Sequence, residues 1–296
     1  MKLKSFTLAV TSSTIILLCA SAQEPSVVAA THDSPIPSAD AEYEAGKNFL
    51  HGSGVEKNPE KALEHFKTAA DQGHIEAPGA IGYFYSVGLV VDKDDVKAAE
   101  CFQKGLEKGS ALAKFNLGRF YLDEKGGLSG RDTGLRLMEE AAASGLSEAH
   151  AALAEIYFLG LYCSDHKPDF TKAAPHVKVT ADNGMASAIN MLGVMKQRGL
   201  GIDEDQKGAE ECFRKSAMKG DFKAQSNLGH LIDPDNKKRT RRIEATAWLI
   251  LAASQNEPLA SRKIAELEQS IPKKDFTAAR EMADELQTKI AEARPK

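Results

Sequence analysis

The chain has 296 residues, of which 38 are basic and 42 acidic, and 42% are hydrophobic. The slight acidic excess argues against nucleic acid as a ligand, because proteins that bind nucleic acid concentrate positive charge on one face. After the first 22 residues no apolar run approaches the ~20 residues that a transmembrane helix needs, so the remainder is expected to be soluble.

Residues 1–22 have the pattern of a secretory signal peptide. Lys2 and Lys4 precede an apolar run, and the run ends in the small residues Ala20-Ser21-Ala22. We therefore expect an exported protein, periplasmic or secreted, whose mature chain starts at Gln23. Loss of Lys2 and Lys4 from the 38 basic side chains leaves 36 against 42 acidic ones.

A lipid anchor on Cys19 is the alternative to this cleavage. It is disfavoured because Leu18 stands where a lipoprotein signal has a small residue. In either case residues 23–40, which contain three prolines and little periodicity, are predicted to form a flexible tether.

Residues 41–260 repeat with a period of 36 residues, apart from one interval of 39. Alanines mark the period at Ala41, Ala77, Ala113, Ala149, Ala188, Ala224 and Ala260. Four residues before six of these alanines stand Gly73, Gly109, Gly145, Gly184, Gly220 and Asn256. Gly and Asn most readily adopt the left-handed conformation that ends a helix. The pattern predicts six repeats, over residues 41–76, 77–112, 113–148, 149–187, 188–223 and 224–260.

Each repeat is predicted to contain two helices joined by a glycine-rich turn. In the first helix, small or apolar residues recur zero, four, seven and eight places after the alanine, which is one face of an α-helix. A glycine follows the fourth-place residue in five repeats, at Gly46, Gly82, Gly118, Gly193 and Gly229. Glycine inside a helix costs about 1 kcal/mol relative to alanine, so its recurrence indicates that the second helix approaches closely.

The end of the chain and two of the repeats depart from the period. Residues 261–296 are predicted to cap the array, with helices near 259–268 and 275–293. Repeat four has three extra residues in its turn, and Pro175 is expected to kink or delay its second helix. Repeat six has the sequence DPDNKKRTRR in place of the glycine-rich turn.

Three segments resemble Sel-1-like repeats, which are relatives of the tetratricopeptide repeat. They are AIGYFYSVGLVVDKDDVKAAECFQKGLEKG (80–109), MLGVMKQRGLGIDEDQKGAEECFRKSAMKG (191–220) and EATAWLILAASQN (244–256). The resemblance implies an all-α, right-handed superhelix of helix pairs that serves as an adaptor or scaffold, often in bacterial envelope processes or signalling.

Two motifs with catalytic or metal-binding chemistry have simpler explanations. Ser216-Ala217-Met218-Lys219 matches the Ser-x-x-Lys of penicillin-recognising enzymes, but Ser216 occupies a small-residue packing position, and the sequence has no Ser-Asp-Asn or Lys-Thr-Gly partner. Zinc-type ligands also gather in repeat four, at Cys163, Asp165, His166 and His176, without the second closely spaced pair that a structural zinc site usually has. We predict no catalytic residue, no metal and no cofactor.

The candidate binding surface consists of the positions two, three and six places after each alanine. These positions fall outside the buried stripe, and the resemblance implies that they face the concave side. Aromatic and arginine side chains are the usual anchors of protein interfaces. The candidate partner-binding residues are Tyr43, Lys47, Tyr83, Phe115, Asn116, Arg119, Asn190, Asn227 and His230. The alternative is that the aromatic residues among them lean onto neighbouring repeats.

A dense basic run lies at the start of the second helix of repeat six. It consists of Lys237, Lys238, Arg239, Arg241 and Arg242. Because positive charge at a helix N-terminus opposes the helix dipole, we expect that local stability does not explain the run. It is a candidate patch for an acidic partner or an anionic envelope component, and the alternative is a solvated loop that tolerates its charges.

These patterns predict an extracytoplasmic scaffold or adaptor that binds a protein or peptide on the concave face of a repeat array. The alternative is an envelope-associated hydrolase or ligand-binding enzyme with an unrecognised site. The sequence favours the scaffold because it contains no metal spacing, phosphate loop or catalytic triad, whereas the repeat accounts for most glycines and alanines.

Overall fold

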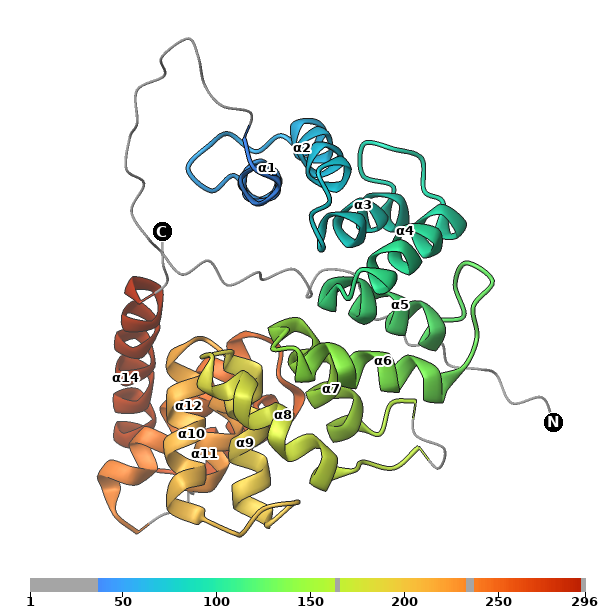
Figure 1. Ribbon diagram of the computed structural model, residues 1–296. Helices are drawn as coiled ribbons and strands as arrows, with labels where there is room; N and C mark the ends of the chain where they lie inside the picture. Colours follow the sequence, from blue (N-terminus) through green and yellow to red (C-terminus); the bar gives the residue numbers. More distant parts are fainter. Residues whose placement is uncertain (1–36, 163–165, 233–236, 294–296) are drawn as a thin grey trace, which may run out of the picture. The chain divides into compact units, whose positions relative to one another are not determined.

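The computed structural model describes residues 37–162, 166–232 and 237–293. In these ranges every element of regular secondary structure is an α-helix (Figure 1), which confirms the all-α prediction. The predicted signal peptide and residues 23–36 of the predicted tether lie outside the described residues. None of the described helices combines the length and the apolar character needed to cross a bilayer.

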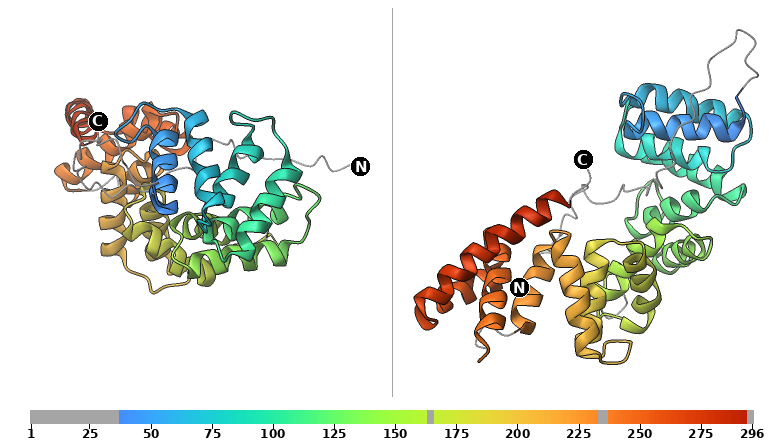
Figure 2. Two further views of the ribbon diagram at one scale, coloured as in Figure 1. Left: turned by 45° about the horizontal axis from the view of Figure 1, so that its top comes forward. Right: turned by 90° about the vertical axis from the view of Figure 1, so that its left-hand side faces the viewer.

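The chain divides into two compact units, residues 1–149 and 150–296. The helices of the first unit are α1 (Ala39–His51), α2 (Pro59–Asp71), α3 (Ala77–Val87), α4 (Asp95–Glu107), α5 (Ala111–Leu122) and α6 (Arg131–Ala143). Helix α7 (Ser147–Leu159) begins in the first unit and continues into the second. The second unit also contains α8 (Phe170–Asp182), α9 (Ala186–Arg198), α10 (Gln206–Met218), α11 (Phe222–Ile232), α12 (Arg239–Ser254), α13 (Pro258–Ser270) and α14 (Lys273–Glu292). From α1 to α6 in the first unit, and from α8 to α14 in the second, each helix packs against the next one along the chain (Figure 2).

The helix stops predicted four residues before the repeat alanines all have left-handed backbone conformations. The φ angle is positive, between 62° and 90°, at Gly73, Gly109, Gly145, Gly184, Gly220 and Asn256. Side chains with a Cβ resist this conformation, and asparagine resists it least. Asn256 therefore ends the second helix of repeat six as glycine does in the other repeats.

Four of the six second helices, α2, α4, α8 and α10, begin at side-chain caps. Asn58 Oδ1 accepts a hydrogen bond from Lys61 N at 3.0 Å, and Pro59 takes the first helical position, as predicted. Aspartates cap α4, α8 and α10 in the same way, at Asp94, Asp169 and Asp205. A cap at one end and a left-handed residue at the other explain why these helices have the same length.

The first helix of repeat three, α5, is capped by a residue that lies directly before the first helix of repeat two. The carboxylate of Glu76, which lies before α3, reaches the N-terminus of α5. It accepts hydrogen bonds from Ser110 Oγ at 2.5 Å, Ala111 N at 3.1 Å and Leu112 N at 3.1 Å. Ser110 Oγ in turn accepts from Ala113 N at 2.8 Å. The N-terminus of α5 is therefore tied to the N-terminus of α3 by polar contacts as well as apolar packing.

The two helices of a repeat approach each other at the glycine in the middle of the first. A methyl group at Gly82 would lie 2.5 Å from Phe102 Cε1, which is closer than two carbon atoms can pack. The remaining four such glycines also meet a large side chain of their own second helix: Gly46 meets Phe66, Gly118 meets Met138, Gly193 meets Phe213 and Gly229 meets Leu249. These contacts confirm the close approach predicted from the sequence.

Repeat four uses a different pair of residues. Ala154 takes the place of the glycine, and the repeat spacing puts Val177 where the other repeats have an aromatic residue, methionine or leucine; both are buried. A smaller residue on the second helix leaves volume for the methyl group on the first. Asp169 caps α8 directly before Phe170, so the delay of this helix expected from Pro175 does not occur.

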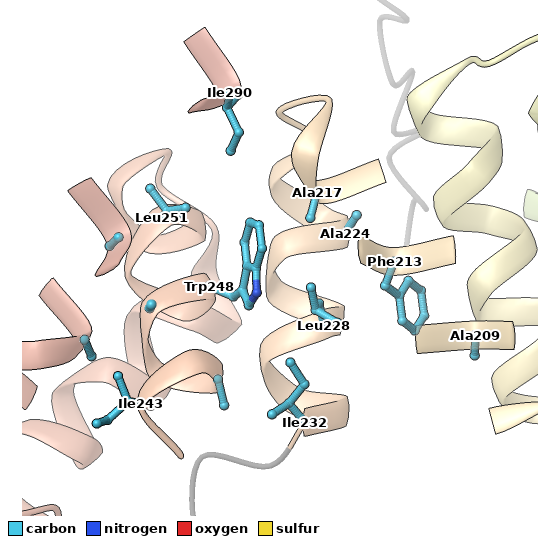
Figure 3. Packing of buried hydrophobic residues seen from close by; sticks show 14 residues of the cluster. Ala209, Phe213, Ala217, Ala224, Leu228, Ile232, Ile243, Trp248, Leu251 and Ile290 are labelled. Carbon is cyan, nitrogen blue, oxygen red and sulfur yellow. The ribbon is translucent and has the colours of Figure 1, made fainter. Parts of the chain in front are cut away.

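Helices α13 and α14 close the C-terminal unit. Helix α14 packs against α12 and α10, and its residue Ile290 joins the cluster around Trp248 (Figure 3). Helix α13 contributes Leu267 to an adjoining cluster with Leu249 and Phe276. The two helices predicted for this segment therefore cover apolar surface of the last repeat.

Candidate protein-binding surface

Of the three candidate positions, only the one six places after the repeat alanine is accessible to solvent in all six repeats. The residues at this position are Lys47, Tyr83 and Arg119 in the N-terminal unit, and Glu155, Val194 and His230 in the C-terminal unit. None of these six is buried. We call the three residues of the N-terminal unit, Lys47, Tyr83 and Arg119, the position-six row.

Positions two and three are more buried than the sequence predicts. Phe115 is 3% exposed, and Asn116 and Asn190 are each 8% exposed. The cause is contact between the first helices of neighbouring repeats: a methyl group at Gly79, a position-two residue on α3, would lie 3.2 Å from Ala113 N at the start of α5. The expectation that Phe115, Asn116 and Asn190 stand clear of the buried face is therefore wrong.

Two of the predicted asparagines bind each other. Asn227 Nδ2 donates a hydrogen bond to Asn190 Oδ1 at 2.9 Å and so joins α11 to α9. The exposed His230 has its Nδ1 2.8 Å from the Ser226 carbonyl oxygen, to which it can donate. The asparagine pair thus stabilises the contact between repeats five and six.

Tyr43 contacts aromatic side chains of its own repeat, whereas the alternative interpretation places the aromatic residues against neighbouring repeats. Its ring stacks on His74 with centroids 4.1 Å apart and an interplanar angle of 17°, and its centroid lies 5.4 Å from that of Phe66. Burial, assisted by the nearby charge of Glu76, raises the pKa of its hydroxyl far above the usual value. Lys47 Nζ lies 2.8 Å from Glu44 Oε1, so its charge is already paired.

Arg119 is the residue of the row whose charge has no ion-pair partner within the described part of the chain. Its guanidinium carbon lies 5.8 Å from the ring centroid of Phe115, a cation–π arrangement that holds the group over the buried ring. Burial raises the pKa of the neighbouring Tyr83 hydroxyl, and the charge of Arg119 opposes this rise. A guanidinium held in place beside a phenol is suited to bind a carboxylate.

Internal ion pairs account for the arginines of the basic run. Arg239 Nε donates to Asp275 Oδ1 at 2.7 Å and Arg242 Nη2 donates to Asp275 Oδ2 at 2.5 Å, and the Asp275 side chain is 1% exposed. These bonds, first from Arg242 and then from Arg239, lower the pKa of Asp275. Arg241 forms two bonds to Glu210, at 2.8 and 2.9 Å.

These pairs correct the expectation that local stability does not explain the run. The arginines tie α12 to α14 and α10 through acids at least 31 residues away in sequence. Lys237 and Lys238, the two lysines of the run, are exposed.

The other sequence candidates have structural roles or lie outside the described residues. Ser216 is fully buried, and its hydroxyl donates to the Ala186 carbonyl oxygen at 2.6 Å, in agreement with its predicted packing role. Cys163 and Asp165 fall outside the described ranges. Within those ranges no three His, Cys, Asp or Glu side chains come together as a metal site.

Two features of repeat four were not found from the sequence. The first is Glu155, whose burial raises the pKa of its carboxyl group against the opposing charge of Lys223. The second is the contact between His150 and His176, whose Nδ1 atoms lie 3.0 Å apart. The 36-residue pattern marks Glu155 as a position-six residue, but no sequence signal links the two histidines.

Comparison with known proteins is consistent with this architecture. The Sel1 repeat model matches residues 39–74, 80–110, 111–146, 147–174, 186–221 and 223–257. The solved structure of a Sel1 repeat protein from Oxalobacter formigenes is 27% identical, covers 78% of this chain and 66% of its own, and superposes with a TM-score of 0.57. A protective antigen of uropathogenic Escherichia coli with an SLR fold superposes with a TM-score of 0.68 at 21% identity, over 87% of this chain and 56% of its own.

A curated relative from Rattus norvegicus, DAP3-binding cell death enhancer 1, is 31% identical over 190 residues. The match covers 63% of this chain, but the chain spans only 36% of that relative's length. The six matched segments together cover most of the described helices. The chain therefore belongs to the Sel1 repeat family.

Proposed function

We propose that the chain is an extracytoplasmic scaffold that binds a protein or peptide partner through the position-six row. Sel1 repeats generally mediate protein–protein interaction, and the name of the rat relative describes it as binding a protein. The row offers an aromatic and an arginine side chain on rigid helices, which is the composition of interface anchors.

The observation that carries this proposal is the state of Arg119. A charged group that is half-buried and lacks an ion-pair partner in the described residues gains most from a partner that supplies a carboxylate. Phe115 holds the guanidinium in place, so little side-chain entropy is lost when the partner binds. The proposed partner therefore presents an aspartate, a glutamate or a chain terminus to Arg119 and Tyr83.

The test begins with in-cell crosslinking and affinity purification to identify a partner, followed by measurement of its affinity. Arg119→Ala is expected to weaken binding by more than about 1 kcal/mol, as an anchor does. Arg131→Ala is the matched control, because Arg131 is an exposed arginine of the same unit. Equal affinities for the wild type and Arg119→Ala, with circular dichroism unchanged, would remove the row from consideration.

The cellular location is a separate part of the proposal. The arrangement of Lys2, Lys4 and the small residues before Gln23 supports export with cleavage after Ala22. Intact-protein mass spectrometry of the chain produced in cells is expected to give a mass that begins at Gln23. A mass that includes Lys2, or one that carries lipid on Cys19, would contradict this cleavage.

A further inference from the structure

Two histidines of repeat four, one on each of its helices, face each other. His150 on α7 and His176 on α8 place their Nδ1 atoms 3.0 Å apart, with the ring centroids separated by 5.1 Å and the planes tilted by 49°. Both side chains are half-buried. The two nitrogens come from different helices and are 26 residues apart in sequence.

The surrounding contacts hold the pair in position. The ring of Tyr157 stacks on that of His176, with centroids 6.1 Å apart and planes within 26°. Thr180 Oγ1 donates to the His176 carbonyl oxygen at 2.8 Å, and His150 directly follows the fully buried Ala149. Neither imidazole is therefore a freely rotating surface group.

We propose that His150 and His176 chelate one divalent transition-metal ion of the nickel and copper type through their Nδ1 atoms. Imidazole nitrogen is a ligand for Zn²⁺, Cu²⁺ and Ni²⁺, with bonds of about 2.0–2.1 Å for zinc. Two nitrogens 3.0 Å apart, bonded to one ion at such lengths, subtend an angle of about 95°.

That angle distinguishes between metals. It fits neighbouring positions of a square-planar or octahedral ion, which are the geometries of Cu²⁺ and Ni²⁺. Tetrahedral Zn²⁺ would need the nitrogens about 3.3–3.4 Å apart at the same bond length. Water molecules would fill the remaining positions from the exposed side.

Metal binding changes the hydrogen bond that now joins the rings. In this hydrogen bond one Nδ1–H group donates to the other Nδ1. The donor ring therefore has to move its proton to Nε2 before the lone pairs of both Nδ1 atoms can bind the ion. The rings must also turn slightly, because the two Nδ1 atoms now face each other and not a shared ion. Lys172, whose Nζ lies 5.4 Å from the Tyr157 ring centroid, is a nearby positive charge that weakens binding of a cation.

The test uses Ni²⁺ as the probe, because Cu²⁺ also oxidises thiols such as the free Cys101 and Cys212. Isothermal titration calorimetry of the full chain is expected to show one Ni²⁺ site that is lost or weakened about tenfold or more in His150→Gln and in His176→Gln, since each removes half of the chelate. His230→Gln, in the same unit, is the matched control and is expected to leave this site unchanged.

Thermal unfolding gives a second measurement. Ni²⁺ is expected to raise the melting temperature of the wild type and not that of His150→Gln, while circular dichroism without metal is the same for both. Unchanged Ni²⁺ affinity in both glutamine variants would overturn the site. Tighter binding of Zn²⁺ than of Ni²⁺ at this pair would overturn the assignment of metal type.

Discussion

Repeats two and six bring their two helices together at the same position and differ in what surrounds it. In repeat two, Gly82 receives the Phe102 ring, and both elements are flanked by further repeats. In repeat six, Gly229 receives Leu249, but α12 is also tied by Arg239 and Arg242 to the buried Asp275 of α14. The last repeat thus adds a charged attachment to the shared apolar contact.

The difference shows how an array can end. An interior repeat is fixed by shape, because the same glycine and large side chain recur on both sides of it. The last repeat has no following repeat to pack against. It is covered by α14, whose position is set by the ion pairs of Arg239 and Arg242 with Asp275. Removing one member of such a buried pair leaves the remaining charge without its partner.

The largest expected effect is the loss of the aromatic ring at the centre of an interior repeat. Phe102→Ala should lower the free energy of unfolding by about 3–5 kcal/mol, because Phe102 is 1% exposed and fills the space beside Gly82. Urea denaturation measures the change. Val96→Ala on the same helix is the control, since Val96 is 57% exposed, and similar losses for the two variants would contradict the packing.

A methyl group added at the glycine should have the next largest effect. Gly82→Ala places Cβ against Phe102 and is expected to cost about 1–3 kcal/mol through overpacking, even though alanine favours the helix. The double variant Gly82→Ala with Phe102→Val copies the pair Ala154 and Val177 of repeat four. Its loss of unfolding free energy should be smaller than the sum of the losses of the two single variants. Additive losses in this double-mutant cycle would show that the pairs are not equivalent.

The ion pair between Glu210 of α10 and Arg241 of α12 should respond to acid. Hydrogen bonds first from Arg241 and then from Arg214 lower the pKa of Glu210 to about 2. Because the folded pKa is depressed, the ion pair's contribution is fully present above the unfolded pKa of about 4.3 and is lost as the pH falls towards 2.

The comparison of the wild type with Glu210→Gln isolates this contribution. Glu210 is partly exposed, so the difference in unfolding free energy at pH 7 should be less than about 1 kcal/mol. Urea denaturation at several pH values should show the difference shrinking between pH 5 and pH 2. A difference that stays constant or grows in acid would contradict the role of Arg241.

The smallest effect is expected at the largest side chain of the C-terminal core. Trp248 is 1% exposed, and its Nε1 has no hydrogen-bond partner in the described residues. Trp248→Phe removes an unsatisfied donor, which costs about 1–3 kcal/mol, and also removes apolar volume. The two effects should offset each other, so urea denaturation should show a change in unfolding free energy of less than about 1 kcal/mol. A loss as large as that of Phe102→Ala would indicate that Nε1 has a hydrogen-bond acceptor.

The sequence predicted the helices, their stops and the close glycine contacts because each is set by residues within one 36-residue period. Gly109 and Asn256 specify a left-handed residue locally, and Gly82 specifies a close neighbour. The assignment of Phe115 and Asn116 to an open face failed for a physical reason. Their exposure depends on how far the first helices of two consecutive repeats overlap, and the 36-residue period does not determine this overlap.

The ion pairs of the basic run could not be predicted for a related reason. Asp275 lies after the last repeat, where no period places it relative to Arg239 and Arg242. The contact between His150 and His176 was missed because the expanded turn of repeat four shifts the spacing between its helices by three residues relative to the other repeats. Where the period is broken, pairing between helices is a property of the fold alone.

The cap that Glu76 provides at the N-terminus of α5 limits how repeats can be exchanged between such proteins. A fragment that starts at Ser110, directly after the helix stop Gly109, loses the carboxylate that caps its first helix. An exchange of repeat three between related chains would need to transfer residues 76 and 110 together. The smallest unit that can be transplanted here is therefore longer than one period and includes the preceding turn.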